Sequence, residues 1–275
     1  MIPDYSQFGN VDFSTGKVPG IGNLAHSELW KDCVAAWCPS LGKTVNTWFD
    51  YSGNRHHGII SGFSDPNSSW GNGAYTNSSA YGFNGATSVV TVPDADDLDG
   101  MPSLTISAFV NMRNNGGGGY GRIIEKNGTT PYMMLNNTSA RYSVYIDGGG
   151  STIDGRVLNV QQHLCYTYAN DYVKLYLDGV LTYEGSLVKG DLETNASDVT
   201  IGNNLAANRG FSGMIDDVRI YSRALSNSEV ATLSRFPRVA YEINPVKRFY
   251  VETPPTGVFF DPFGSLFDPF GVLLK

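Results

Sequence analysis

The chain has 275 residues, with 26 acidic side chains against 19 basic ones, and a formal net charge of −7. These charges form no basic block, so the composition argues against the counterion release that drives nucleic-acid binding. No stretch approaches the roughly 18 consecutive apolar residues of a membrane-spanning helix. The first residues also lack the basic start and apolar core of a signal peptide, which predicts a chain that stays in the cytosol of the cell that makes it.

Aromatic residues and glycine are plentiful, whereas only 16% of the residues are charged. This balance favours aromatic strands joined by tight turns over long salt-bridged helices. The three cysteines are Cys33, Cys38 and Cys165. An odd number makes neither a disulfide framework nor a complete metal site, so we expect free thiols.

In chain order, residues 1–32 show no sustained periodicity and are predicted to form an extended N-terminal arm. Period-two alternation then begins and indicates half-buried strands. It is clearest over 104–112, where every second residue is apolar, and it recurs over 142–146, 164–168 and 173–177. Glycine, asparagine or aspartate separate these runs, so we predict an all-β domain over 33–235.

Two local signals mark the second half of this domain. Asp178-Gly179 lies between two alternating runs and predicts a hairpin turn, because both residues tolerate positive φ. Ser226 and Glu229 form a capping-box pattern that predicts a short helix, with Val230 and Leu233 facing the core. Residues 236–275 follow as an extended, proline-punctuated tail in which FDPFG occurs twice, at 260–264 and 267–271.

The segment GFSGMIDDVRIYSRALSNSEVATL at 210–233 resembles the closing motif of the laminin G-like jelly-roll branch of the concanavalin A-like lectins and glucanases. Further segments match this family in the expected order, from about residue 33 to residue 234. They are VAAW at 34–37, FDYSGNRHHG at 49–58, YGFNG at 81–85, VVTVP at 89–93, LTISAFVNM at 104–112, QHLCYTY at 162–168 and VKLYLDGVL at 173–181.

The resemblance implies a two-sheet antiparallel jelly-roll sandwich, with loops at its rim forming any ligand surface. It does not by itself imply an activity, because this fold serves lectins, glycosidases, adhesion modules and structural proteins alike. In similar proteins the loop at Asp50 and Asn54 lies beside the strand that carries Asp216 and Asp217. Such a site would bind a structural calcium ion through carboxylate and amide oxygens.

These residues can also be explained without a metal ion. Period two places Asp216 on the side of Val218 and Ile220, where a lone buried carboxylate needs a cation or hydrogen-bond donors. Backbone N–H groups could satisfy Asp216, and an Asx-turn could satisfy Asp50. DADDLDG at 94–100 lacks the final glutamate of an EF-hand and is interpreted as a polar loop. His56, His57 and His163 do not have the spacing of a zinc site.

Similar retaining glycosidases of this fold carry an E-x-D-x-E strand, which places two carboxylates about 5 Å apart. This sequence contains no such string. It also lacks the nucleophile elbow, the phosphate loop and the dinucleotide fingerprint. We therefore expect a protein that is not an enzyme. Four aromatic residues are candidates for stacking on sugars, although aromatic residues in a sandwich are more often core. They are Tyr120, Tyr132, Trp70 and Tyr81.

Three functions remain in view: a structural or decorating subunit of a larger assembly, a glycan-binding lectin-type module and, least favoured, a glycoside hydrolase. SRFPRVAYEI at 234–243 resembles the ends of jelly-roll proteins encoded by bacteriophages, which favours a virion surface protein assembled in the host cytoplasm. Residues 1 to about 30 and 236–275 would then form intersubunit contacts, with four phenylalanines of the tail buried against other virion subunits or copies of the chain. These anchors are Phe260, Phe263, Phe267 and Phe270. The alternative is a tail that folds back onto its own sandwich.

Overall fold

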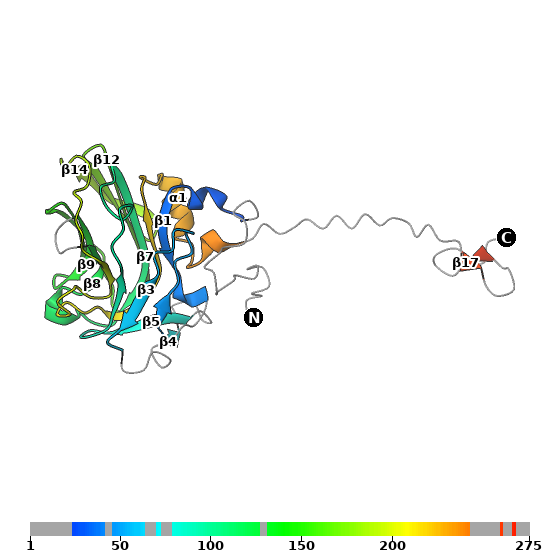
Figure 1. Cartoon of the computed structure of the whole chain (residues 1–275), viewed down its shortest axis with the longest axis horizontal. Helices are drawn as coiled ribbons and strands as arrows, with labels where there is room; N and C mark the ends of the chain where they lie inside the picture. The colour runs from blue at the N-terminus through cyan, green and yellow to red at the C-terminus, as the bar shows by residue number, and fades with distance from the viewer. Residues whose placement is uncertain are drawn as a thin grey trace. The chain divides into compact units, whose positions relative to one another are not determined.

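The first unit of the chain, Met1–Ile243, contains a two-layer β-sandwich, and its described residues include one α-helix, on the outside of one sheet (Figure 1). The computed structural model describes residues 24–41, 46–63, 82–126 and 131–242, and the backbone alone of 70–72, 79–81, 259–260 and 266–267. Within those residues no helix is long and apolar enough to cross a membrane. All pairings between strands are antiparallel, which confirms the predicted jelly-roll sandwich.

The first sheet, here called the covered sheet, has eight strands in the order β14-β13-β12-β7-β16-β5-β4, and β1 also pairs with β16. Its strands are β1 (Cys33–Trp37), β4 (Trp70–Asn72), β5 (Ser79–Asn84), β7 (Ser103–Met112), β12 (Gln161–Ala169), β13 (Tyr172–Leu177), β14 (Val180–Ser186) and β16 (Ser212–Tyr221).

The second sheet, here called the open sheet, also has eight strands, in the order β11-β10-β9-β8-β15-β6-β3-β2. Its strands are β2 (Thr47–Trp48), β3 (Gly58–Ser61), β6 (Val89–Val92), β8 (Arg122–Lys126), β9 (Tyr132–Asn137), β10 (Arg141–Ile146), β11 (Gly149–Asp154) and β15 (Val199–Ile201).

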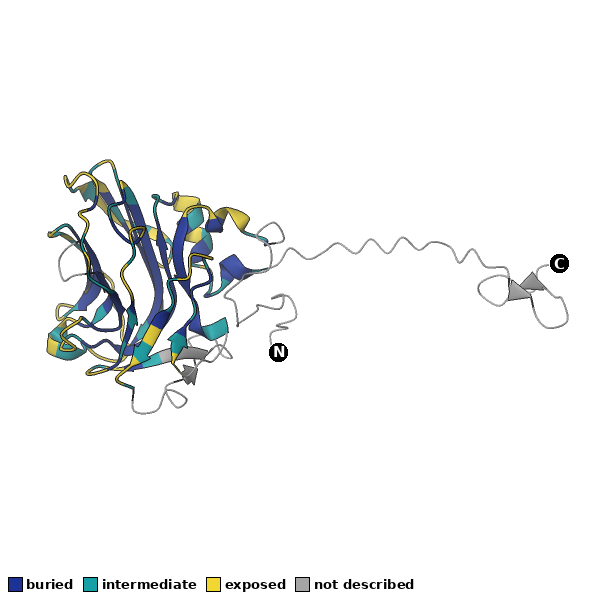
Figure 2. Ribbon diagram, viewed as in Figure 1, coloured by how far each residue is buried: buried dark blue, intermediate teal, exposed yellow. Residues whose placement is uncertain are grey.

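The main core lies between the two sheets, where period-two alternation places one face of each strand (Figure 2). Leu104, Ile106, Ala108, Val110 and Met112 all face this core from β7, as the sequence predicts. The hairpin turn at Asp178-Gly179 is also confirmed, with φ of 51° and 79° at its two residues.

A second apolar cluster covers the outer face of the covered sheet. It is built from helix α1 (Asn227–Leu233) and from the short 3₁₀ helices η3 (Ser27–Trp30) and η6 (Val239–Tyr241). The capping box of α1 forms as predicted, and Val230 and Leu233 are buried. Two further 3₁₀ turns are η4 (Pro39–Leu41) and η5 (Gly117–Gly119).

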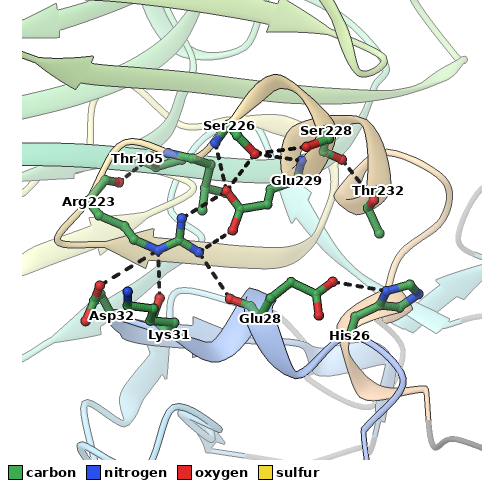
Figure 3. Close-up of polar contacts among 11 residues, drawn as sticks. His26, Glu28, Lys31, Asp32, Thr105, Arg223, Ser226, Ser228, Glu229 and Thr232 are labelled. Carbon is green, nitrogen blue, oxygen red and sulfur yellow. Dashed lines mark hydrogen bonds and ion pairs between the residues drawn. The ribbon is translucent and has the colours of Figure 1, made fainter.

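Arg223 joins η3 to α1 (Figure 3). Its guanidinium donates to the carbonyl oxygens of Glu28 and Lys31, at 3.1 and 3.0 Å, and to the carboxylate of Glu229 at 2.6 Å. The same carboxylate accepts a hydrogen bond from the backbone N–H of Ser226. These contacts lower the pKa of Glu229 to about 2, chiefly through the bonds from Arg223. The ion pair between Arg223 and Glu229 thus supports the N-terminal cap of α1, and Arg223 also binds the backbone of η3 and of Lys31.

The second cluster includes residues from both predicted arms. Leu24, Leu29 and Trp30 before the sandwich and Val239 and Tyr241 after it are all buried. The described parts of both arms therefore pack on their own domain. The intersubunit contacts expected of residues 1 to about 30 and 236–275 stay a prediction, and most of these residues fall outside the described part of the chain.

The C-terminal residues 244–275 form a separate unit. In it, β17 (Phe259–Phe260) pairs antiparallel with β18 (Leu266–Phe267), with Phe259 opposite Phe267. The hairpin thus joins the two FDPFG repeats through their backbones. Of the four predicted anchors, Phe260 and Phe267 lie in these strands, and Phe263 and Phe270 lie outside the described residues.

A buried arginine holds the two ends of the domain together beneath α1 and η6. The Nε of Arg219 donates to Asp217 at 2.9 Å, and its Cζ lies 4.8 Å from the ring centroids of both Trp30 and Tyr241. The Nε1 of Trp30 in turn donates to the carbonyl oxygen of Ala240 at 2.8 Å. The guanidinium therefore contacts a ring from before the sandwich and a ring from after it, and the two rings also contact each other edge to face, with their centroids 4.9 Å apart.

We predict that Arg219→Met destabilises the domain by about 3–5 kcal/mol, because it leaves the carboxylate of Asp217 buried without its partner. The free energy of unfolding from urea titration measures this cost. The double variant Arg219→Met/Asp217→Asn removes both charges and should recover part of the loss. Equal stability of the single and double variants would show that the pair is not coupled.

Candidate functional site

Five loops meet at one end of the sandwich, here called the loop end. The register places them together: Asn111 of β7 is opposite Gln161 of β12, Gly213 of β16 is opposite Met112, and Ser212 is opposite Asn84 of β5. The loops are 85–88, 113–121, 138–140, 155–160 and 202–211. Rim loops are where this architecture places ligands, so this end is the first candidate surface.

Asparagine side chains give these loops their shape. The Oδ1 of Asn84 accepts hydrogen bonds from the backbone N–H groups of Ala86, Thr87 and Ser88, at 2.8–3.1 Å. The buried Asn203 accepts from the N–H of Arg209 at 3.0 Å and donates to the carbonyl oxygen of Ala86 at 2.8 Å. Each amide thus satisfies backbone groups that have no strand partner. The surface is therefore formed before any ligand arrives.

Glycines allow two of these loops to touch. The N–H of Gly117 donates to the carbonyl oxygen of Gly210 at 2.8 Å, and a Cβ atom on Gly116 would overlap that oxygen. A Cβ on Gly210 would lie 2.6 Å from the backbone of Gly85. The glycine run at 116–121 is thus packed against loop 202–211 rather than projecting as a free hairpin tip.

Tyr120 is the exposed aromatic of this end, with 43% of its surface accessible. The Cζ of Arg209 lies 5.7 Å from the centroid of its ring, and the guanidinium also donates to the carbonyl oxygen of Gly118 at 3.3 Å. Tyr132 is one of the four aromatic residues that the sequence proposes for stacking on sugars. That prediction is wrong for Tyr132, because this residue is fully buried in the core. The side chains of Trp70 and Tyr81 lie outside the described set.

Asp50, the first predicted calcium ligand, is buried and surrounded by donors. Its carboxylate accepts from the N–H groups of Ala36, Ser52 and His56 at 2.8–2.9 Å, and from the hydroxyl of Ser52 at 2.7 Å. Asn54 donates to the carbonyl oxygen of Val34 at 2.7 Å. These contacts join the loop after β2 to β1, which is the hydrogen-bonded arrangement that the Asx-turn reading describes.

Asp216 and Asp217 lie on β16, where Asp216 immediately precedes a β-bulge and Asp217 lies within it. The bulge, with Asp217 at φ 44°, changes the parity of the strand. Val218 and Ile220 face the core as predicted, but Asp216 faces outward beside Cys38 and Ser40, which corrects the side expected from strict period two. Sequence alternation alone cannot reveal an extra residue of this kind.

The four predicted ligands do not form one cluster: in the described part of the chain, no three His, Cys, Asp or Glu side chains gather as a metal site. Calcium at Asp50, Asn54, Asp216 and Asp217 stays a prediction. Binding at Asp50 would have to replace several of its four hydrogen bonds. A rise in the melting temperature on adding calcium, reversed by EDTA, would support it.

The polar loop at 94–100 and the adjacent histidines His56 and His57 are each bonded to nearby groups. The ammonium of the buried Lys126 contacts the carboxylates of Asp94 and Asp99 and the carbonyl oxygen of Ser197. Lys126 thus brings a positive charge to the polar loop at 94–100. His56 pairs with Asp97 at 3.0 Å, and His57 accepts from the backbone N–H of Asp50, so each histidine is engaged separately.

The outer face of the open sheet carries one buried carboxylate, Glu125 of β8. Its partner is Arg122, and its cross-strand neighbours in the same row are Met133 and Thr200. A retaining glycosidase needs a second carboxylate about 5 Å away. The neighbouring positions of this row supply none.

Ser107 and His163 form a hydroxyl–imidazole pair on the outer face of the covered sheet, with Oγ and Nε2 2.8 Å apart. Both side chains are 1% exposed, and burial lowers the pKa of His163 to about 3, which keeps the ring neutral. Its Nδ1 has no hydrogen-bond partner, whereas a catalytic triad places a carboxylate there. The pair is closed to a substrate in this conformation.

Residues 84–231 match the family described as the concanavalin A-like lectin/glucanases superfamily, over more than half of the chain. The chain belongs to this superfamily. A 141-residue segment, half of the chain, is 28% identical to the adhesion G-protein coupled receptor V1 of Danio rerio, and it spans only 2% of that receptor.

Solved structures share the fold at low identity. Domain 4 of AbnA, a GH43 extracellular arabinanase from Geobacillus stearothermophilus solved with arabinotriose, has a TM-score of 0.56 at 19% identity, over 74% of this chain and 98% of that domain. The binding domain of Paraclostridial Mosquitocidal Protein 1 has a TM-score of 0.57 at 16% identity, over 75% of this chain and 52% of that one. At these identities the likeness shows the fold alone.

Asp216 leads to a prediction about pH. Burial, and then the neighbouring charge of Asp217, raise the pKa of Asp216 from 3.8 to about 7. Because the folded state holds this proton more tightly than the unfolded state, the stabilisation is complete below about pH 4 and is lost as pH rises towards 7. We expect Asp216→Asn to be more stable than the wild type at pH 8, by on the order of a few kcal/mol.

Urea titrations at pH 5 and pH 8 measure this effect. Ser40→Ala, which keeps the carboxylate, is the matched control and should retain the pH dependence. A wild type and an Asp216→Asn variant with parallel stability curves between pH 5 and 8 would contradict the prediction.

Proposed function

We propose that this chain is a non-catalytic adhesion module that binds glycans at the loop end, with Tyr120 as the ring on which a sugar stacks. The observation that carries the proposal is Tyr120 itself: an exposed aromatic on a preformed loop, with a guanidinium beside it. Aromatic rings combine an apolar face with adjacent polar groups, as sugars require.

The loop that brings Arg209 to Tyr120 also carries polar side chains that could bond to sugar hydroxyls. Arg209 uses one nitrogen for the carbonyl oxygen of Gly118 and has further N–H donors in its fork. Asn204 and Asn208 bond to each other at 3.0 Å and line the same loop. These side chains are already held by the protein, so little conformational entropy is lost when a ligand binds.

The comparisons support this proposal without deciding it. The AbnA domain is a structure of this fold in complex with an oligosaccharide, and the matched receptor is named as an adhesion protein. Glu125, which pairs with Arg122 and has no second carboxylate in its row, and the buried Ser107–His163 pair supply no matching support for hydrolysis.

We expect Tyr120→Ala to weaken glycan binding by about tenfold, the loss that one aromatic contact of about 1.5 kcal/mol predicts. A glycan array identifies the ligand, and isothermal titration calorimetry measures the affinity. Tyr172→Ala is the matched control, since Tyr172 is 40% exposed but lies at the start of β13, at the opposite end of the sandwich. Equal losses in both variants, or no glycan bound, would count against the proposal.

Assembly into a virion or another particle is a second proposal, and the C-terminal unit supports it. Residues 244–275 form a second compact unit, and its paired strands connect two FDPFG repeats. Four phenylalanines in so short a segment need an apolar partner, which a neighbouring subunit would provide.

Deletion of residues 244–275 tests this second proposal. Because Tyr241 is buried in the sandwich, a chain ending at Ile243 should keep its melting temperature, whereas one ending at Arg235 should be destabilised. We expect the shorter deletion to lower the oligomeric state measured by light scattering. A full-length chain that is already monomeric would refute the assembly role.

A further inference from the structure

Loop 155–160 presents three aliphatic side chains to solvent. Val157, Leu158 and Val160 are 48%, 41% and 49% exposed, and Asn159 between them is exposed as well. Here they are called the aliphatic prong. Single exposed apolar residues are ordinary, but three on one loop expose a patch that a soluble protein seldom keeps without a use.

Buried polar contacts hold this prong in place. The Oε1 of Gln162 accepts from the N–H of Val157 at 2.8 Å and from the hydroxyl of Tyr142 at 3.0 Å, and its Nε2 donates to the carbonyl oxygen of Gly155 at 2.8 Å. Asn159, at φ 58°, donates its N–H to the carbonyl oxygen of Met112 at 2.7 Å. The loop is thus anchored at both ends and in the middle, with its apolar side chains turned out.

The charges around the prong differ from those of the whole chain. Among the described residues in and beside the loop end, arginine is the only basic type, and each acid there either pairs with an arginine or belongs to the Asp178-Gly179 turn. The arginines are Arg113, Arg122, Arg141, Arg156 and Arg209, and the acids are Glu125, Asp154 and Asp178.

The opposite end of the sandwich, by contrast, is acidic. Its loops at 93–102, 147–148, 170–171 and 187–198 contain nine acidic residues and one lysine, and the buried Lys126 adds one further positive charge there. The excess negative charge of the domain is therefore concentrated away from the prong. In the field of an anionic surface this asymmetry orients the loop end towards that surface.

We propose that the loop end docks on a phospholipid bilayer, with the aliphatic prong inserted among the upper acyl chains and the surrounding arginines at anionic headgroups. A bilayer accepts a protruding aliphatic loop without a matching groove, and its anionic surface attracts nearby basic side chains. The prong residues themselves favour this partner over a protein. Protein hot spots are rich in Trp, Tyr and Arg and poor in Leu and Val. This proposal does not depend on glycan binding at Tyr120.

Vesicle sedimentation with the full chain tests the proposal. We expect binding to vesicles of equal parts phosphatidylcholine and phosphatidylserine, and weaker binding to phosphatidylcholine alone because headgroup charge contributes. The variant Val157→Ser/Leu158→Ser should lose at least about tenfold in partition coefficient, since both inserted side chains become polar.

Its control is Ile59→Ser/Val188→Ser, which removes two exposed aliphatic residues outside the loop end and should bind as the wild type does. A gain-of-signal variant, Leu158→Trp, should be quenched by brominated acyl chains, whereas Val188→Trp should not. Circular dichroism confirms that each variant is folded, and glycan affinity measured in parallel should be unchanged by the prong substitutions.

Three results would overturn the proposal: no binding of the wild type to either vesicle, equal binding of the wild type and the prong variant, or equal losses in the prong variant and its control. If the prong variant instead loses a protein ligand while vesicles bind neither form, the prong is a protein-docking surface. Loss of glycan binding in Tyr120→Ala with vesicle binding intact would leave both proposals standing.

Discussion

The contact between Arg219 and two aromatic rings decides which surfaces of this protein remain open. Trp30 comes from before the sandwich and Tyr241 from after it, and the guanidinium that contacts both rings is paired with Asp217 on β16. A buried charge is stable only where its partners are fixed, so this arrangement holds both chain segments against the covered sheet. Helix α1 then completes the cover. The outer face of that sheet is consequently filled by the protein's own residues.

With one sheet face occupied, the surfaces left for recognition are the outer face of the open sheet and the two ends. At the loop end, amide side chains form hydrogen bonds with backbone N–H and C=O groups that have no partner on a neighbouring strand. Asn84 and Asn203 each bond several backbone groups, and Gln162 does the same for the prong. Such loops lose little freedom on binding, which suits a surface that recognises a ligand without chemistry.

The two proposals for this end are physically compatible. Tyr120 and Arg209 lie on loops 113–121 and 202–211, while the prong lies on loop 155–160, and Arg156 bonds to the carbonyl oxygen of Ala140 between them. A module that holds a sugar close to a bilayer would use an aromatic ring and an aliphatic prong side by side. The acidic opposite end would then face away from the membrane.

Much of the architecture was predictable because it depends on local rules. Alternation over 104–112 predicts which side chains face the core, Asp178-Gly179 predicts its turn, and Ser226 with Glu229 predicts the helix cap. Each of these signals lies within a few residues of its consequence. Asp216 marks the limit of such rules, because a bulge adds one residue to β16 and turns that carboxylate to the other face.

The sequence by itself determined an all-β domain, the core-facing side of strands such as β7 and the closing helix, since short-range periodicity and turn chemistry encode them. Its motifs added the two-sheet jelly roll through their resemblance to a known family. Only the tertiary structure decided that Asp50 is satisfied by four donors, that Tyr132 is core while Tyr120 is exposed, and that Val157, Leu158 and Val160 remain uncovered. The physical reason is that hydrogen-bond saturation and solvent exposure depend on which segments, distant in the chain, come to lie together.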